Sequence, residues 1–368
     1  MKTIRRLIYG EVLAAVGFVT LCFLALFFFF DFVEEVQSIG RHGPVEYQLV
    51  HALTYVTLMI PSHLYELLPI AVLIGTIFVM ARFAKSSEYT ILRTSGLGPW
   101  RALKTLLILG LAYVLLTFAI GDYLAPIADR SAQLLKARYQ GHITLGHTGA
   151  WLKERQAYSQ YAVNIAALDS DSSMRGVRVI EFDNQGFLRS VLVAEKAIHG
   201  ADDSWTLTQV VRTEFPARDA AVGRIERQQL ENFRWPNQIS AEMVSAALLK
   251  PERMSTIALF QYVRHLDVNG QSAQRYQIEF WKKVFYPLSC MVMVVLALPF
   301  AYLHFRSGGI TGYVFGGVMA GISFFLLNNV FGYIGNLQSW QPWLTAALPG
   351  IIYSLLSLTA FGWLVFRR

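Results

Sequence analysis

Six long apolar runs restrict the fold of this chain more than any other feature of its sequence. A helix needs about 20 mostly apolar residues to cross roughly 30 Å of hydrocarbon. Inside the bilayer a segment must satisfy its own backbone hydrogen bonds, so each run is predicted to be a membrane-spanning helix. The expected spans are residues 12–30, 53–81, 102–121, 284–304, 309–334 and 343–366.

The charged residues predict how the spans are oriented. Only 15% of the residues are charged, although the net charge is +7, and the basic residues gather at the ends of the apolar runs. Six spans bring both termini to one side, and most Lys and Arg of the short loops lie on that side. The opposite short loops, 31–52 and 335–342, hold only Arg41. Because Lys and Arg favour cytoplasmic loops, we expect cytoplasmic termini.

The polar segment 125–275 is predicted to be a separate all-β domain outside the cytoplasm. Apolar and polar residues alternate in 177–182, 187–194 and 205–211, and Asp183 to Gly186 supply a turn between the first two runs. Such short, regularly spaced runs are typical of a sandwich or barrel, and the pattern alone does not select a jelly roll. Cys22 and Cys290 both lie in apolar runs, so no disulfide framework is expected. The expected parts are therefore 1–124 with three spans, the β domain 125–275, and 276–368 with three more.

The sequence holds no motif for ATP hydrolysis, metal catalysis or acyl transfer. It lacks G-x-x-x-x-G-K-[ST] and a nucleophile elbow, and His63-x-x-Glu66 is not a zinc-protease motif. We therefore expect no catalytic residue, no metal site and no cofactor, and we expect any ATP hydrolysis on a separate chain. Two alternatives to a transporter are a membrane enzyme acting on lipid-linked glycans and a scaffold that recruits periplasmic proteins. The enzyme would need acidic or histidine residues clustered at one membrane face, and the sequence shows no such cluster.

The cytoplasmic loop between the second and third spans predicts a short helix at about 87–95. Ser86 can cap its start, Glu88 falls in the first turn where the helix dipole favours an anion, and Gly96 suits the residue after the last turn. The helix could lie in the membrane interface as an ordinary amphipathic segment. It could instead dock on a cytosolic partner as a coupling helix.

Several stretches of the chain, in order, resemble the lipopolysaccharide export permeases, the LptF/LptG (YjgP/YjgQ) family. They are Ser87-Glu88 with Ser95-Gly96 after a span that contains Pro61 and Pro69, Gly121-Asp122 with Ala125-Pro126, Gly149-Ala150-Trp151-Leu152-Lys153, and Arg275-Tyr276 with Trp281, Lys283, Phe285 and Pro287-Leu288. The resemblance covers essentially the whole chain. The last stretch is most similar to the LptG branch.

The resemblance implies a fold, a role and partners. It implies an α-helical membrane protein with six transmembrane helices and an inserted, jelly-roll-like periplasmic domain, in the inner membrane of a Gram-negative bacterium. The expected partners are an LptF-like subunit, a cytosolic LptB-like ATPase dimer and an LptC-like periplasmic bridge protein. Together they would extract lipopolysaccharide and pass it toward the outer membrane. The residues expected to couple the chain to the ATPase are Ser87, Glu88 and Arg93.

Ionisable residues near the outer ends of the spans are candidates for the substrate path. His63 and Glu66 lie one turn apart in the second span, where ionisable groups normally face a cavity or a partner. Further candidate cations are Lys282, Lys283 and Arg41, although the two lysines could simply extend toward the interface. The family's lysines at the outer end of the first span are replaced here by Asp31, Glu34 and Glu35, which puts a phosphate-binding role for that end in doubt.

Overall fold

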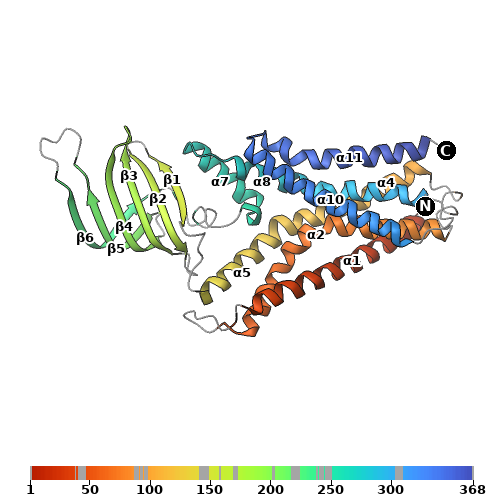
Figure 1. The fold of residues 1–368 in the computed structure, drawn as a ribbon, viewed down its shortest axis with the longest axis horizontal. Coiled ribbons are helices and arrows are strands. Elements are labelled where there is room, and N and C mark those ends of the chain that lie inside the picture. The colour runs from red at the N-terminus through yellow and green to blue at the C-terminus, as the bar shows by residue number, and fades with distance from the viewer. Residues whose placement is uncertain are drawn as a thin grey trace. The chain divides into compact units, whose positions relative to one another are not determined.

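A computed structural model describes most of the chain, and it separates into two compact units (Figure 1). The described residues are 2–37, 39, 47–86, 91, 94, 98–140, 149–156, 159–168, 173–200, 204–216, 224–237, 239, 244, 251–302 and 310–366. The first unit comprises Met1–Val33, Met59–Ala128 and Gln277–Arg368, and the second comprises Glu34–Leu58 and Asp129–Tyr276.

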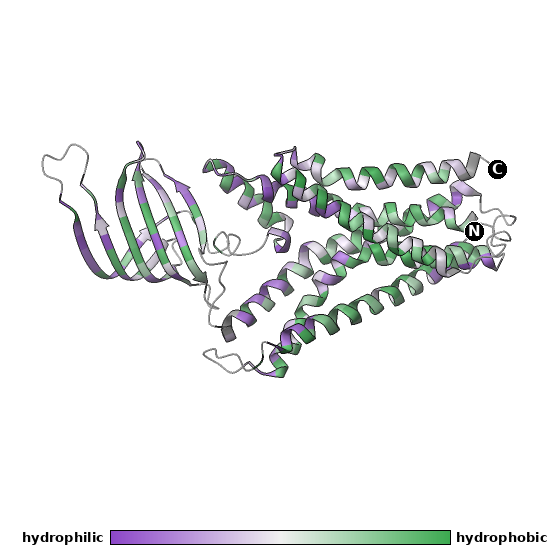
Figure 2. Ribbon diagram, in the orientation of Figure 1, coloured by the Kyte–Doolittle hydropathy of each residue, from purple (hydrophilic) through white to green (hydrophobic). Residues whose placement is uncertain are grey.

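The prediction of six membrane-spanning helices is confirmed. The candidate spans are Thr3–Val36, Leu49–Lys85, Pro99–Lys136, Gln274–Ala301, Val314–Leu337 and Pro342–Trp363. The main helices are α1 (Lys2–Val36), α2 (Leu49–Lys85), α4 (Pro99–Ala119), α10 (Ile310–Leu337) and α11 (Pro342–Phe366). Most exceed the apolar runs because hydropathy marks only the part of a helix that lies in hydrocarbon. Figure 2 shows this as green helix centres with more purple toward several ends.

The third span continues through a register change instead of ending near Gly121. A π-helical turn, η1 (Ile120–Leu124), joins α4 to α5 (Ala125–Gln140). The N–H of Ala125 bonds the carbonyl of Ile120, five residues earlier. The next donor in that register would be the N–H of residue 126, which is Pro126 and has none. Proline is thus accommodated in a continuous helix, as happens in membrane helices when other groups satisfy the backbone.

The fourth span is divided by short 3₁₀ turns. It runs through α8 (Gln274–Phe285), η3 (Tyr286–Leu288), α9 (Ser289–Ala297) and η4 (Leu298–Tyr302). A buried apolar cluster in the first unit draws residues from α1, α2, α4, α9 and α11. Close helix contact depends on small residues: a Cβ on Gly75 of α2 would lie 2.7 Å from the backbone nitrogen of Val16 in α1.

The second unit contains a six-stranded antiparallel sheet in the order β1-β2-β3-β4-β5-β6 (Figure 1). The strands are β1 (Ala150–Arg155), β2 (Ser159–Leu168), β3 (Met174–Asp183), β4 (Leu188–His199), β5 (Ser204–Glu214) and β6 (Glu226–Pro236). The three strands expected from alternation correspond to β3, β4 and β5, so the inserted β domain is confirmed. The described strands form one meander, and the jelly-roll form stays a prediction.

Two helices within 125–275 were not predicted. α5 occupies its first 16 residues. The other, α7 (Thr256–Val268), follows the short η2 (Pro251–Arg253) and has its own start and stop signals. The Ser255 side chain accepts a hydrogen bond from the N–H of Ala258 at 3.2 Å, which caps the start. Gly270, at φ +63°, lets the N–H of Gln271 reach the carbonyl of Leu266 at 2.9 Å and closes the end.

Candidate functional site

Ion pairs join α1 and α2 near both ends of the first unit's hydrocarbon region. Near one end Arg82 Nη2 lies 3.0 Å from Glu11 Oε2, and near the other His63 Nε2 lies 2.6 Å from Asp31 Oδ2. About 20 residues of helix separate the two α1 carboxylates, which corresponds to roughly 30 Å. That distance equals the thickness of the hydrocarbon core. The two pairs therefore bracket the depth at which lipid tails lie.

An apolar groove of about 400 Å³ lies between these levels. Its lining comes from α1, α2 and α10: Glu11, Ala14, Ala15, Phe18, Val19, Ile74, Phe78, Val79, Arg82 and Val314. The Glu11–Arg82 pair forms part of its wall, while the remaining lining is alanine, aliphatic or phenylalanine. Such a surface can accept a hydrocarbon chain, and its charged residues mark one end.

The predicted site residue His63 faces α1 in the structure. Besides its contact with Asp31, its ring centroid lies 5.1 Å from that of Phe27. The side chains of His63 and Asp31 retain 20% and 27% exposure, so both remain partly accessible. A short contact between carboxylate and imidazole is a charge-assisted hydrogen bond when the imidazole is protonated. The structure gives His63 an intramolecular partner and leaves it partly exposed, and its place in the substrate path stays a prediction.

Glu66 does not join the His63–Asp31 pair. Its side chain is exposed, and its backbone carbonyl accepts a hydrogen bond of 2.6 Å from the Tyr286 hydroxyl in η3. The Tyr286 ring also contacts Tyr65 of α2, with centroids 5.1 Å apart. The second and fourth spans are therefore joined at the level of Glu66 through backbone and aromatic contacts.

The two candidate lysines of α8 have different surroundings. Lys282 Nζ lies 2.7 Å from Glu279 Oε1, and both side chains are largely shielded, at 16% and 14% exposure. Lys283 is buried, and its ammonium donates to the carbonyl of Gly121 at 3.0 Å. In the π register this carbonyl would accept from the N–H of residue 126, but residue 126 is proline and has no N–H. Lys283 therefore supplies a donor that the π-helical turn lacks, and a role for it in the substrate path stays a prediction.

Gly121 is required by the packing around this lysine. A Cβ at position 121 would lie 2.3 Å from the ring of Tyr65. The same ring lies beneath the Lys283 ammonium, 5.6 Å from ring centroid to Nζ, within the range of a cation–π contact. The sequence stretches around Gly121 and Lys283, far apart in the chain, thus meet at one buried point.

A second polar cluster, in the second unit, was missed by sequence reasoning. Glu35 is 5% exposed; one of its oxygens lies 2.9 Å from Lys136 Nζ and the other accepts from the Tyr47 hydroxyl at 3.0 Å. Lys136 Nζ also lies 4.6 Å from the ring centroid of Tyr55. Burial, and then the nearby Glu35 carboxylate, raise the pKa of Tyr47. The acidic residues of α1 had been noted, but nothing in the sequence links Glu35 to a lysine about 100 residues later.

The expected coupling residues Ser87, Glu88 and Arg93 lie outside the described residues, as does Arg41. In the same loop, the hydroxyl of Thr94 donates to the carbonyl of Ile91 at 2.9 Å, and Ile91 is exposed. The coupling helix therefore stays a prediction from sequence.

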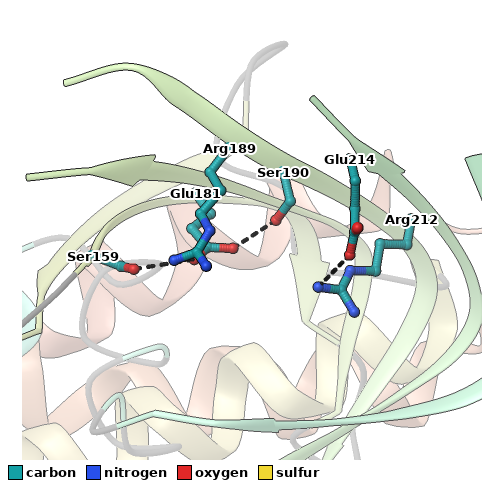
Figure 3. Close-up of polar contacts among 6 residues, drawn as sticks. All are labelled: Ser159, Glu181, Arg189, Ser190, Arg212 and Glu214. Carbon is teal, nitrogen blue, oxygen red and sulfur yellow. Dashed lines mark hydrogen bonds and ion pairs between the residues drawn. The ribbon is translucent and has the colours of Figure 1, made fainter. Parts of the chain in front are cut away.

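The sheet carries its own polar cluster, drawn in Figure 3. Glu181 of β3 accepts hydrogen bonds from Ser159 of β2 at 3.0 Å and Ser190 of β4 at 2.7 Å, while Arg189 Nη1 lies 3.7 Å away. Nearby, a second ion pair joins Arg212 to Glu214 within β5. The Glu181 contacts join three neighbouring strands, so we assign them to the stability of the sheet. Within the described part of the chain, no group of three His, Cys, Asp or Glu side chains could hold a metal ion.

Comparisons with known proteins agree with this architecture. A family model described as "Lipopolysaccharide export system permease LptF/LptG" matches residues 6–364. The protein named Lipopolysaccharide export system permease protein LptG of Escherichia coli (strain K12) is 27% identical over 339 residues, 91% of each chain. The protein of the same name from Haemophilus influenzae (strain ATCC 51907 / DSM 11121 / KW20 / Rd) is 25% identical over 371 residues, covering 100% of this chain and 99% of that one.

Proposed function

Because the chain belongs to the LptF/LptG family of lipopolysaccharide export permeases, we propose that it is the LptG-type subunit of a complex that lifts lipopolysaccharide out of the inner membrane. As a permease it is an inner-membrane transport protein and not an enzyme. The proposal adds what this chain contributes: a lipid path along α1, α2 and α10. The groove between those helices is the observation that carries it.

The path matches the chemistry of an amphipathic lipid. The groove has an apolar wall for acyl chains, and the Asp31–His63 pair lies about one hydrocarbon thickness from the Glu11–Arg82 pair. A head group arriving near His63 would meet a partly exposed imidazole already held by a carboxylate. A phosphate must therefore compete with Asp31 for His63, a competition that the family's lysines would not impose.

The proposed complex needs three kinds of partner. This chain has no phosphate-binding loop of its own, so a cytosolic LptB-like ATPase dimer would supply the energy. We assign coupling to the segment 87–95 with Ser87, Glu88 and Arg93. An LptF-like subunit would complete the membrane part, and an LptC-like protein would receive lipopolysaccharide in the periplasm. The Lys/Arg asymmetry supports cytoplasmic termini and a periplasmic β domain.

Site-specific photocrosslinking tests the path. A photoreactive residue replaces Phe18, which lines the groove on α1 and is 70% exposed, or Leu115, which lies on α4 outside the groove and is 64% exposed. In cells the Phe18 position should form an adduct with lipopolysaccharide that increases when the ATPase is active. The Leu115 position is the matched control. Equal adduct yields at both positions would reject the groove as the path.

Copurification tests the assignment to a transporter. The chain, purified in mild detergent, should carry an ATPase with a phosphate-binding loop and a second six-span subunit. A chain that is monomeric and without an ATPase would instead favour the scaffold or enzyme alternatives.

A further inference from the structure

α7 presents an apolar stripe to its surroundings. Three large apolar side chains of this helix are exposed: Ile257 at 61%, Phe260 at 57% and Val268 at 69%. With 3.6 residues per turn, they fall on one side of the helix together with exposed Arg264. Exposed Gln261 and Asp267 lie at the two edges of this stripe. We call Ile257, Phe260, Arg264 and Val268 the outer stripe of α7.

The opposite side of α7 packs into the protein interior. Leu259, Tyr262 and Leu266 are all buried, and they lie about half a turn from the outer stripe. The backbone N–H of Arg155 in β1 donates to the Asn269 side chain at 2.7 Å, just after α7 ends. The interior side and the helix end are thus fixed to the unit by contacts other than those of Ile257 and Val268.

A short chain connection keeps α7 close to the start of the fourth span. Only a short connection separates Val268 from the start of the fourth span at Gln274. That span has 28 residues, which corresponds to about 42 Å of helix and exceeds the roughly 30 Å of hydrocarbon. The apolar run of this span begins near residue 284, so the first turns of α8 extend beyond the hydrocarbon on the side of α7. Ring contact between Tyr262 and Tyr276, at 4.6 Å, packs α7 against those turns.

We infer that α7 is an interfacial membrane anchor whose outer stripe inserts into the lipid head-group layer beside the fourth span. Ile257, Phe260 and Val268 enter the boundary between head groups and acyl chains, about 5–10 Å deep, as amphipathic interfacial helices do. Arg264 lies in the middle of the stripe, and its long side chain can extend back to lipid phosphates. Asp267, at the edge, stays in water. A lipid surface, with phosphates above acyl chains, suits this arrangement of one central cation among apolar residues.

An ion pair joins the segment before α7 to the start of the fourth span. Arg275 at the start of the fourth span lies 3.1 Å from Glu252, just before α7. This pairing offsets the charge of the Glu252 carboxylate near the start of α7, and Arg264 is the charged residue of the outer stripe itself. The anchor would hold the beginning of the fourth span and the helix that precedes it at a fixed depth.

Spin-label depth measurements on the whole chain in phospholipid nanodiscs test the inference. Cys22→Ala removes an exposed thiol, while buried Cys290 can remain. A nitroxide is then attached at Phe260→Cys, at Gln185→Cys in an exposed turn, or at Leu355→Cys on the exposed surface of α11. The last two serve as controls for water and for lipid. Collision rates with oxygen and with a water-soluble nickel chelate report where each label lies.

The oxygen-to-nickel collision ratio at position 260 should exceed that at 185 several-fold and stay below that at 355, which lies near the middle of α11. Labels at Ile257→Cys and Val268→Cys should agree, which guards against a local defect at Phe260. A ratio equal to that at 185 would put the stripe in water and overturn the inference. An immobilised label shielded from both reagents would overturn it too, because a protein would then cover the stripe. The readout is depth alone, so its result is independent of whether the chain transports lipopolysaccharide.

Discussion

Replacing Lys283 by Met should destabilise the membrane unit through one identifiable backbone atom. The ammonium of Lys283, a residue only 8% exposed, donates to the Gly121 carbonyl at 3.0 Å. A buried acceptor left without a donor costs about 1–3 kcal/mol. Hydrogen bonds between membrane helices average about 0.6 and reach about 1.7 kcal/mol. We expect a loss of about 1.5 kcal/mol, near the upper end, because Pro126 has no N–H to take over.

The same reasoning predicts a rescue. Pro126→Ala provides the N–H that the π register at Gly121 lacks, so Lys283→Met should cost about 1 kcal/mol less in the Pro126→Ala background. Lys282→Met is the matched control, because Lys282 binds Glu279 and not the turn. Its cost should be the same in both backgrounds. Unfolding of the purified chain in mixed micelles with an increasing fraction of sodium dodecyl sulfate measures all six proteins.

A Lys283→Met cost that is unchanged by Pro126→Ala would refute the assignment of the lysine to this carbonyl. A Lys283→Met protein of normal stability that fails only in lipopolysaccharide export would refute it as well, and would return Lys283 to the substrate path. Stability and transport therefore have to be measured on the same variants.

Three further predictions concern coupling, topology and pH. Glu88→Lys should leave the protein inserted but detach the ATPase, since loss of a buried charge pair across an interface costs about 2–5 kcal/mol; normal ATPase stoichiometry in a pull-down would contradict this. A periplasm-specific reporter fused near Gly200 should be active, and activity only of a cytoplasmic reporter there would disprove the topology. Burial lowers the pKa of His265 below its ordinary 6.5, against the smaller opposite effect of Glu154. Neutral His265 therefore contributes to the free energy of unfolding above about pH 6.5, and this contribution is lost as pH falls through the folded-state pKa. His265→Gln should flatten the thermal-unfolding response of the β domain between pH 7.5 and 5, and an unchanged slope would count against it.

The spans could be predicted because the bilayer imposes one requirement on every residue in it. Apolar length alone therefore located all six helices. It could not locate the end of the third, since Pro126 normally signals that a helix stops. At the turn before the proline, the Gly121 carbonyl accepts a hydrogen bond from Lys283, which lies in another span. That information is tertiary, and no local pattern carries it.

Strands were predicted in only part of the sheet, and β1 and β2 were not predicted although their residues also alternate in burial. β3, β4 and β5 have neighbours on both edges, and their alternating burial appears as alternating hydropathy. β6 lies at the edge of the sheet and is largely exposed along its length, so its sequence is polar on both faces. An exposed polar edge strand is expected in a sheet that must avoid pairing with other chains. Because β6 is polar along much of its length, its sequence lacks the alternating hydropathy by which the inner strands were predicted.

The acidic outer end of α1 shows how far residue type alone can lead toward a site. Asp31, Glu34 and Glu35 suggested that this end is unsuited to phosphate. In the structure Asp31 contacts His63, and Glu35 contacts Lys136. Lys136, and His63 when it is protonated, are groups that a phosphate could bind, and both already contact carboxylates. A phosphate recognised by either residue would therefore have to displace the carboxylate that the residue already contacts. We therefore predict that the departure from the family's lysines weakens the binding of a phosphate head group at this end of α1.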